Sequence, residues 1–137
     1  MSEVLVDTNV LVSFLTDRDA AQKDSAARLF AAAESGDTRL VLHQTVLSEL
    51  VYVLSNLYGL AAADVSATLA ELLAMPGVAA IDKIVWPVVL DLWPGKIAGF
   101  ADAVLVATAR DGRHERVATF DLELRRALKR HGLRSYW

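Results

Sequence analysis

The chain has 137 residues, of which 54% are hydrophobic and 23% are charged, and it contains no cysteine. This composition predicts one compact globular domain, residues 1–137, and excludes a disulfide scaffold and a thiolate metal site. The formal net charge of −3 argues against a protein that coats nucleic acid through charge alone. The N-terminal segment has neither a basic stretch nor a long apolar run, so we expect no signal peptide, no membrane association and a cytoplasmic location.

The hydrophobic pattern alternates between strand-like and helix-like segments. The apolar run Val4-Leu5-Val6 passes directly into Asp7-Thr8-Asn9, residue types that begin helices, which is typical of a buried parallel strand followed by a helix. Further strands are predicted at 40–42, 78–81 and 116–120, with a short edge strand at 134–137. Helices are predicted at 24–34, 45–58, 63–74, around Pro87 to near Pro94, at 100–110 and at 122–130. This order predicts a three-layer α/β fold, a central and mostly parallel sheet of four to five strands with helices on both faces.

Four acidic residues stand out through their positions in this pattern. Asp7 follows the first strand and Asp121 follows the fourth, so both lie at the carboxyl ends of strands, where open α/β sheets bind ligands. Asp102 is in the first turn of an apolar helix, and Glu49 is one turn into the helix after the second strand. Carboxylates that meet in apolar surroundings repel one another, and a divalent cation relieves that repulsion. Their oxygens suit Mg²⁺ or Mn²⁺, whereas the three histidines are too scattered to suggest zinc.

Each acid also has an ordinary structural interpretation. Asp7 and Asp121 could each cap the helix that follows, and Asp102 could be a first-turn acid favoured by the helix dipole. Glu49 could project into water, as most glutamates do. The four positions together, in one sheet order, favour a shared site.

Charge is unevenly distributed along the chain. Residues 1–109 contain 6 basic and 13 acidic side chains, a balance of −7, whereas residues 110–137 contain 8 basic and 4 acidic side chains, a balance of +4. Such a chain could hold a cation in one place and phosphates in another. The candidate phosphate-binding residues are Arg125, Arg126, Lys129 and Arg130. The alternative is that they form the solvated face of a terminal helix.

The sequence around the four acids resembles the PIN-domain nucleases. The matching segments are Val-Leu-Val-Asp7-Thr-Asn, Ser-Glu49-Leu, Phe-Ala-Asp102-Ala-Val-Leu-Val-Ala-Thr-Ala and Ala-Thr119-Phe-Asp121, in this order along the chain. Each segment alone is a weak signal, and the four together are specific. The small size resembles the VapC-type toxins of toxin–antitoxin pairs. The Trp- and Pro-rich stretch 86–95 is the less typical part.

The resemblance implies a metal-dependent ribonuclease that hydrolyses phosphodiester bonds in structured RNA, with one or two Mg²⁺ or Mn²⁺ ions activating water. It implies that Asp7, Glu49 and Asp102 are core metal ligands and that Asp121 completes the catalytic site. Thr8, Asn9 and Thr119 are candidates to orient these ligands, and the four basic residues of 125–130 are candidates to bind RNA. The implied partners are a transfer or ribosomal RNA substrate, a cognate antitoxin and a second copy of the chain. The helices at 24–34, 45–58 and 63–74 are candidate protein-binding surfaces, unless they simply pack in the core.

Other functions stay open on the sequence alone. A PIN nuclease could act in RNA processing and not as a toxin, and a PIN-like module could bind partners without catalysis, although none of its acids is missing here. Receiver domains and aspartate phosphatases also carry acids after the first strand. Here Asn9 occupies the position where such phosphatases need a second Asp, and no Lys directly follows the fourth strand, where receivers carry one.

Overall fold

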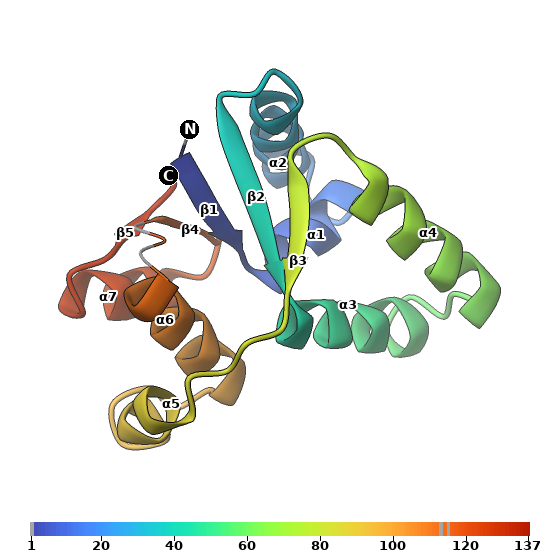
Figure 1. The fold of residues 1–137 in the computed structure, drawn as a ribbon. Helices are drawn as coiled ribbons and strands as arrows, with labels where there is room; N and C mark the ends of the chain where they lie inside the picture. The colour runs from blue at the N-terminus through green and yellow to red at the C-terminus, as the bar shows by residue number, and fades with distance from the viewer. Residues whose placement is uncertain (1, 113, 115) are drawn as a thin grey trace.

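The structure is a computed structural model that describes residues 2–112, 114 and 116–137. In this part of the chain five strands alternate with seven helices (Figure 1). The strands are β1 (Ser2–Val6), β2 (Thr38–His43), β3 (Val78–Ile81), β4 (Arg116–Ala118) and β5 (Arg134–Ser135). The helices are α1 (Thr8–Leu15), α2 (Ala20–Glu34), α3 (Gln44–Asn56), α4 (Ala62–Ala74), α5 (Trp86–Leu92), α6 (Phe100–Gly112) and α7 (Leu122–Arg130).

The strands form one sheet in the order β3-β2-β1-β4-β5, and every neighbouring pair is parallel. The chain first builds outward from β1 to β2 and β3, then crosses to the other side of β1 for β4 and β5. The strand order therefore reverses at β1, and the carboxyl ends of β1 and β4 lie side by side, with Val6 opposite Ala118. Such a reversal point is where open parallel sheets place their ligands. The predicted α/β class and sheet are confirmed.

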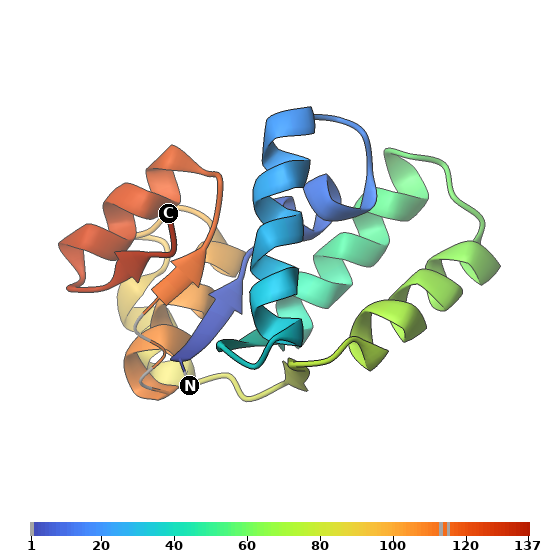
Figure 2. The ribbon, with the colours of Figure 1, turned by 90° about the horizontal axis from the view of Figure 1, so that it is seen from above.

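The core explains why the central strand β1 is apolar from Val4 to Val6, after Ser2 and Glu3 at its start. Val4, Leu5 and Val6 are completely buried, because helices cover both faces of a parallel sheet. Helices α1 to α4 gather beside β2 and β3, and α5 to α7 gather beside β4 and β5 (Figures 1 and 2). Of the helices in the described residues, none is long and apolar enough to span a lipid bilayer.

Local capping shifts some boundaries from those predicted. Helix α2 begins at Ala20 and not at 24, because the Asp19 side chain accepts a hydrogen bond from the Gln22 N–H at 2.9 Å. The first helix after Asp7 ends at Leu15, and α2 is a separate helix. Strand β4 ends at Ala118 and not at 120, because Thr119 and Phe120 bond to the side chains of Asp7 and Asn9.

Candidate active site

Asp7 lies at the end of β1, at the point where the strand order reverses. Its backbone N–H donates to the Ala118 carbonyl of β4 at 2.9 Å, which extends the sheet by one residue. Its carboxylate accepts hydrogen bonds from the Thr8 N–H at 2.8 Å, from Asn9 Nδ2 at 3.0 Å and from Thr119 Oγ1 at 2.7 Å. Asp7 is also the N-cap of α1. Capping and a role in a site are therefore compatible, because these bonds hold the carboxylate in one orientation.

Thr119 and Asn9 join the ends of β1 and β4 around this carboxylate. The Phe120 N–H donates to Asn9 Oδ1 at 3.1 Å, and the Asp121 N–H donates to Thr119 Oγ1 at 3.1 Å. Arg125 donates from Nε and Nη2 to the Thr119 carbonyl, at 3.1 and 3.0 Å. Asn9 and Thr119, predicted to orient the acids, thus contact Asp7 directly, and Arg125 braces the segment that carries Thr119.

Asp121 uses part of its carboxylate as the N-cap of α7. Its Oδ1 accepts from the Glu123 N–H at 2.8 Å and from the Leu124 N–H at 3.4 Å. The capping interpretation is therefore correct for Asp121 as well. The charge of Asp121 still acts on Asp7 and Asp102, which places it beside the other acids.

Glu49 and Asp102 approach the same place from two helices. Glu49 is exposed on α3, and Asp102 is partly buried in the first turn of α6. The charge of Asp7 raises the pKa of both side chains, and the charge of Glu49 adds to the effect on Asp102. The structure therefore brings all four acids predicted from the sequence into one electrostatic cluster.

Burial and like charge both disfavour the ionised form of the carboxylates in this cluster. Burial is the largest cause that raises the pKa of Asp7, and it outweighs the hydrogen bonds that favour the ionised form. Burial followed by the charges of Asp7, Asp121, Glu49 and Glu123 raises the pKa of Asp102 to about 6. No described Lys or Arg forms an ion pair with any of the four acids. The site therefore carries negative charge that the described protein does not neutralise.

The Thr8 hydroxyl is a buried polar atom without a hydrogen-bond partner among the described residues. It lies toward Glu49, where it favours the ionised carboxylate, but not with the geometry of a full hydrogen bond. Buried hydroxyls are normally satisfied by protein, water or an ion. This atom therefore marks a polar position beside the acids that a water molecule or ligand would satisfy.

The donor set fits a hard divalent cation such as Mg²⁺ or Mn²⁺. All four candidate ligands are carboxylates, and neutralising their mutual repulsion is what a bound cation supplies. Within residues 2–112, 114 and 116–137, no three His, Cys, Asp or Glu side chains are yet close enough to ligate one ion. Asp7 is fixed by its hydrogen bonds, whereas Glu49 is exposed and has the rotamer freedom to move toward it.

The stretch rich in Trp and Pro supports the helix that carries Asp102. Trp86 and Trp93 pack their rings against Phe100, the first residue of α6, with centroids 6.2 and 5.3 Å away. Trp93 Nε1 also donates to the Ala98 carbonyl at 3.1 Å. These contacts fix the start of α6, and this part of the chain therefore helps to position Asp102.

A cleft of about 290 Å³ adjoins Asp102 and contains residues that the sequence analysis missed. Glu123, from the first turn of α7, lines it and raises the pKa of Asp102. Lys96 and Gly99 line it from the loop before α6. Glu123 could have been found from its place two residues after Asp121. Lys96 is close to Asp102 in the chain, but no pattern in the sequence indicates that it lines the cleft.

The candidate RNA-binding residues lie on α7, beside this cleft. Arg126 and Arg130 line the cleft itself, and Lys129 is exposed on the same helix. Arg125 differs from the other three, because two of its nitrogens already bond to the Thr119 carbonyl. The structure thus gives Arg125 a bracing role that the sequence did not indicate.

Comparison with solved structures shows which proteins share this fold. VapC20 of Mycobacterium tuberculosis, described as a toxin that cleaves the sarcin–ricin loop, is similar with a TM-score of 0.69 and 20% identity, over 90% of this chain and 94% of that chain. VapBC2 of Rickettsia felis, solved bound to a DNA fragment from their promoter, is similar with a TM-score of 0.67 and 16% identity, over 97% and 96%. The PIN domain endonuclease Utp24 is similar with a TM-score of 0.52 and 15% identity, over 93% and 77%. At these identities the likeness establishes a shared fold.

Sequence comparison identifies the family. Curated proteins give no significant match. The sequence model of the PIN domain matches residues 4–129, which include all four acids and most of α7. The resemblance predicted from the segments around Asp7, Glu49, Asp102 and Asp121 is confirmed, and the chain belongs to the PIN domain family.

Proposed function

We propose that the chain is a metal-dependent endoribonuclease of the VapC type, acting in the cytoplasm as the toxin of a toxin–antitoxin pair. The observation that carries this proposal is the cluster of Asp7, Glu49, Asp102 and Asp121 at the reversal point of a parallel sheet. Burial and mutual repulsion raise the pKa of three of these acids, and no described cation neutralises them. Membership of the PIN domain family and the fold shared with VapC20 support a nuclease.

In this proposal the acids divide the work of the site. Asp7, Glu49 and Asp102 bind the divalent cation, and Asp121 completes the site while it caps α7. When bound, the cation supplies activation of water and charge neutralisation at the phosphate. Asn9 and Thr119 keep the Asp7 carboxylate in one orientation, as supporting hydrogen bonds do in metal sites.

The proposed partners are structured RNA of the transfer or ribosomal class, a cognate antitoxin and a second copy of the chain. The surface that favours protein contacts is the α3–α4 arm, residues 44–74. It exposes the large apolar side chains Val51, Tyr52, Leu57, Tyr58, Leu60 and Leu73. Apolar side chains clustered on an exposed surface are typical of protein interfaces. VapC20, which has the same fold, is described as a toxin.

Metal-dependent cleavage of RNA tests the proposed function. Purified protein in EDTA should not cut a structured RNA, and added Mg²⁺ or Mn²⁺ should restore cutting, because all candidate ligands are hard oxygen donors. Zn²⁺ should not replace them, since no Cys is present and no described His joins the acids. Full activity in EDTA would exclude the metal mechanism. Release of phosphate from a small ester without RNA cleavage would favour a phosphatase, and binding without any cleavage would favour a silent PIN-like module.

A further inference from the structure

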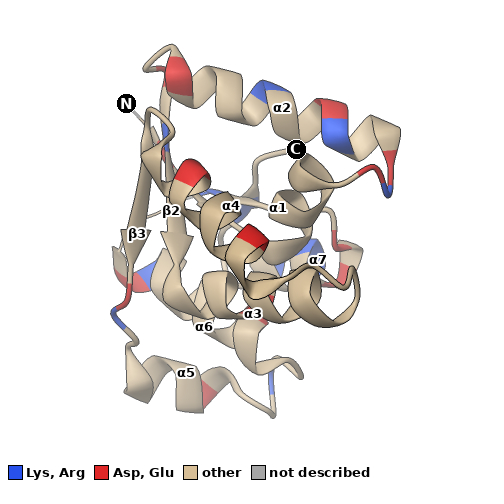
Figure 3. Ribbon diagram, turned by 90° about the vertical axis from the view of Figure 1, so that its right-hand side faces the viewer, with Lys and Arg blue, Asp and Glu red and all other residues tan. Residues whose placement is uncertain are grey.

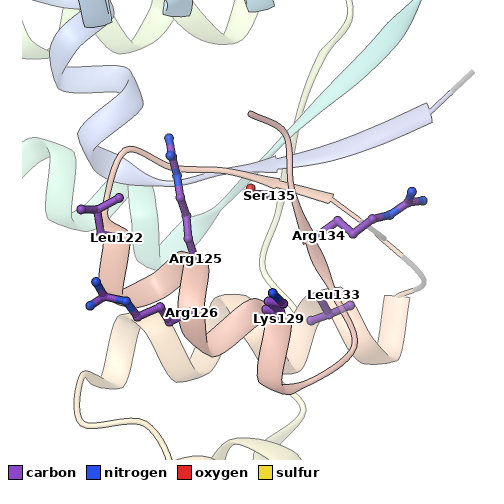
Figure 4. Close-up of a pocket in the computed structure, with 7 residues that line it drawn as sticks. All are labelled: Leu122, Arg125, Arg126, Lys129, Leu133, Arg134 and Ser135. Carbon is purple, nitrogen blue, oxygen red and sulfur yellow. The ribbon is translucent and has the colours of Figure 1, made fainter.

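A second cavity, of about 530 Å³, lies between α7 and the segment that follows it into β5 (Figure 4). Its volume is in the range of small-molecule and cofactor sites. Two leucines and four cationic side chains contribute most of its lining, namely Leu122, Leu133, Arg125, Arg126, Lys129 and Arg134. An apolar surface ringed by cations suits a ligand that combines a flat apolar group with negative charge.

Helix α7 presents two adjacent faces, one to each cavity. Leu122, Arg126 and Lys129 are spaced at i, i+4 and i+7, so they share the face that lines the larger cavity. Glu123, Arg126 and Arg130 are spaced at i, i+3 and i+7, and they line the cleft beside Asp102. Arg126 is at the boundary and lines both cavities. A ligand in the larger cavity is therefore next to whatever occupies the cleft of the carboxylates.

The cations of this helix lack acidic partners. Arg126, Lys129 and Arg130 form no ion pair with a described residue, whereas Lys23 and Arg28 near α2 pair with Asp17 and Asp24. Positive charge is also concentrated nearby. Burial and the charges of Arg110, Arg130 and Lys96 lower the pKa of His131, although Asp91 acts in the opposite direction. Cations without acidic partners at the edge of a cavity, here Arg126 and Lys129, favour an anionic ligand over a neutral one.

We propose that the cavity between α7 and β5 is a subsite for one nucleotide of the RNA strand that flanks the bond being cut. The base packs against Leu122 and Leu133, and the phosphates contact Arg126 and Lys129. This inference rests on the proposed ribonuclease function. It adds the direction of the bound RNA, because the strand then runs from the carboxylates over α7. Because Arg126 lines both cavities, a ligand here continues into the cleft where, under the proposed function, a phosphodiester is cut. RNA therefore fits the cavity better than an acidic peptide does.

Binding measured without metal tests the charged part of the subsite. A fluorescein-labelled single-stranded oligoribonucleotide is titrated with protein in EDTA, where no cleavage occurs, at several salt concentrations. R126A/K129A should weaken binding roughly thirtyfold and reduce the slope of log Kd against log salt by about 1.4, because two phosphate contacts are lost. The matched control, K23A/R28A, also removes two exposed cations and should leave both quantities unchanged.

A second variant tests the apolar part. Leu122→Ala should weaken binding about fivefold with an unchanged salt slope, because it removes apolar contact and no charge. Leu90→Ala on α5 is the control, since Leu90 and Leu122 are both 60% exposed. In Mg²⁺, both subsite variants should raise KM for RNA, because they weaken binding of the strand.

The outcomes separate this inference from the proposed function. Wild-type protein that cuts RNA, with both subsite variants binding RNA as tightly as wild type, would overturn the subsite and leave the nuclease standing. Saturable micromolar binding of free AMP, lost in Leu122→Ala, would assign the cavity to a free nucleotide and overturn the RNA assignment. Wild-type protein that neither binds nor cuts RNA would refute the function itself.

Discussion

Two regions on either side of the carboxylates differ sharply in chemistry. The α3–α4 arm contains Glu49, Asp64 and Glu71, and no Lys or Arg occurs from residue 40 to residue 82. On α4 every coloured segment is red in Figure 3. The basic end, α7 with the segment into β5, contains five Lys or Arg residues between 122 and 135. Glu123 is the only acid in that range, and Asp121, the cap of α7, directly precedes it.

Under the proposed function, this difference favours a separate surface for each of the two proposed kinds of partner. RNA is a polyanion and gains affinity from Lys and Arg contacts to its phosphates, which the basic end offers and the arm does not. The arm exposes apolar side chains such as Tyr52 and Leu57, which are 61% and 72% exposed, and therefore suits a protein partner. Asp7 and Asp102 belong to neither surface, whereas Glu49 lies on the arm and Asp121 caps α7.

The largest expected effect comes from the acids themselves. Asp102→Asn should reduce RNA cleavage about a thousandfold, because the cation supplies several kcal/mol of charge stabilisation in the transition state. Asp7→Asn should act similarly, although the one oxygen of Asn cannot replace both Asp7 oxygens, of which Oδ1 accepts from the Thr8 N–H and Oδ2 from Asn9 and Thr119. Cleavage is measured on structured RNA in Mg²⁺, with Asp64→Asn on the arm as a control of equal charge change.

The same variants test whether the two surfaces are separable from the chemistry. Asp102→Asn should retain RNA binding in EDTA and the oligomeric state of the wild type, because Asp102 belongs to neither surface. Near wild-type cleavage by Asp102→Asn would remove this residue from the proposed site. If Asp102→Asn lost self-association as well as activity, the arm and the acids would not be independent.

A smaller effect is expected from a charge on the arm. Leu57→Asp should weaken dimerisation about a hundredfold, because a carboxylate at an apolar contact must be desolvated without a partner. Light scattering over a protein dilution series measures the dimer, and fluorescence anisotropy measures RNA binding, which should not change. If Leu57→Asp dimerises like wild type, the arm is not the contact between copies, and R126A/K129A should then be examined for the same property.

The smallest effect concerns pH and the metal-free protein. Because burial and neighbouring acids raise the pKa of Asp102 to about 6 from 3.8, its protonated form stabilises the fold. This contribution is present in full below pH 3.8 and is lost as the pH rises through about 6. The Tm in EDTA should therefore fall between pH 4 and pH 7, and the fall should be about 2–4 °C larger in wild type than in Asp102→Asn. The difference is modest because solvent screens this half-exposed carboxyl.

Added Mg²⁺ sharpens the interpretation of that measurement. At pH 7 the ion should raise the Tm of the wild type, since it binds the folded protein, and should raise that of Asp102→Asn less. An identical pH dependence in wild type and variant would mean that Asp102 is not coupled to its neighbours as the structure indicates.

Most of the fold was predictable from the sequence because its signals are local. The run Val4 to Val6 must be buried on both faces, and the capping residues after it begin a helix. The alternation of strands and helices then leaves few arrangements other than a parallel sheet. Where the prediction was wrong, as at the start of α2, a capping side chain at Asp19 decided the boundary.

The positions of Asp7, Glu49, Asp102 and Asp121 in the chain were likewise enough to predict that they meet, because the carboxyl ends of parallel strands share one edge. The sequence did not indicate that Arg125 braces Thr119, that Glu123 joins the acids or that Trp93 supports α6. Nor did it indicate that Arg126 borders both the cleft and the larger cavity. These relations depend on contacts between α7, the loop before α6 and the two central strands. They were decided by the tertiary structure, because the packing of α7 and of the loop before α6 against the central strands determines what each of these side chains contacts.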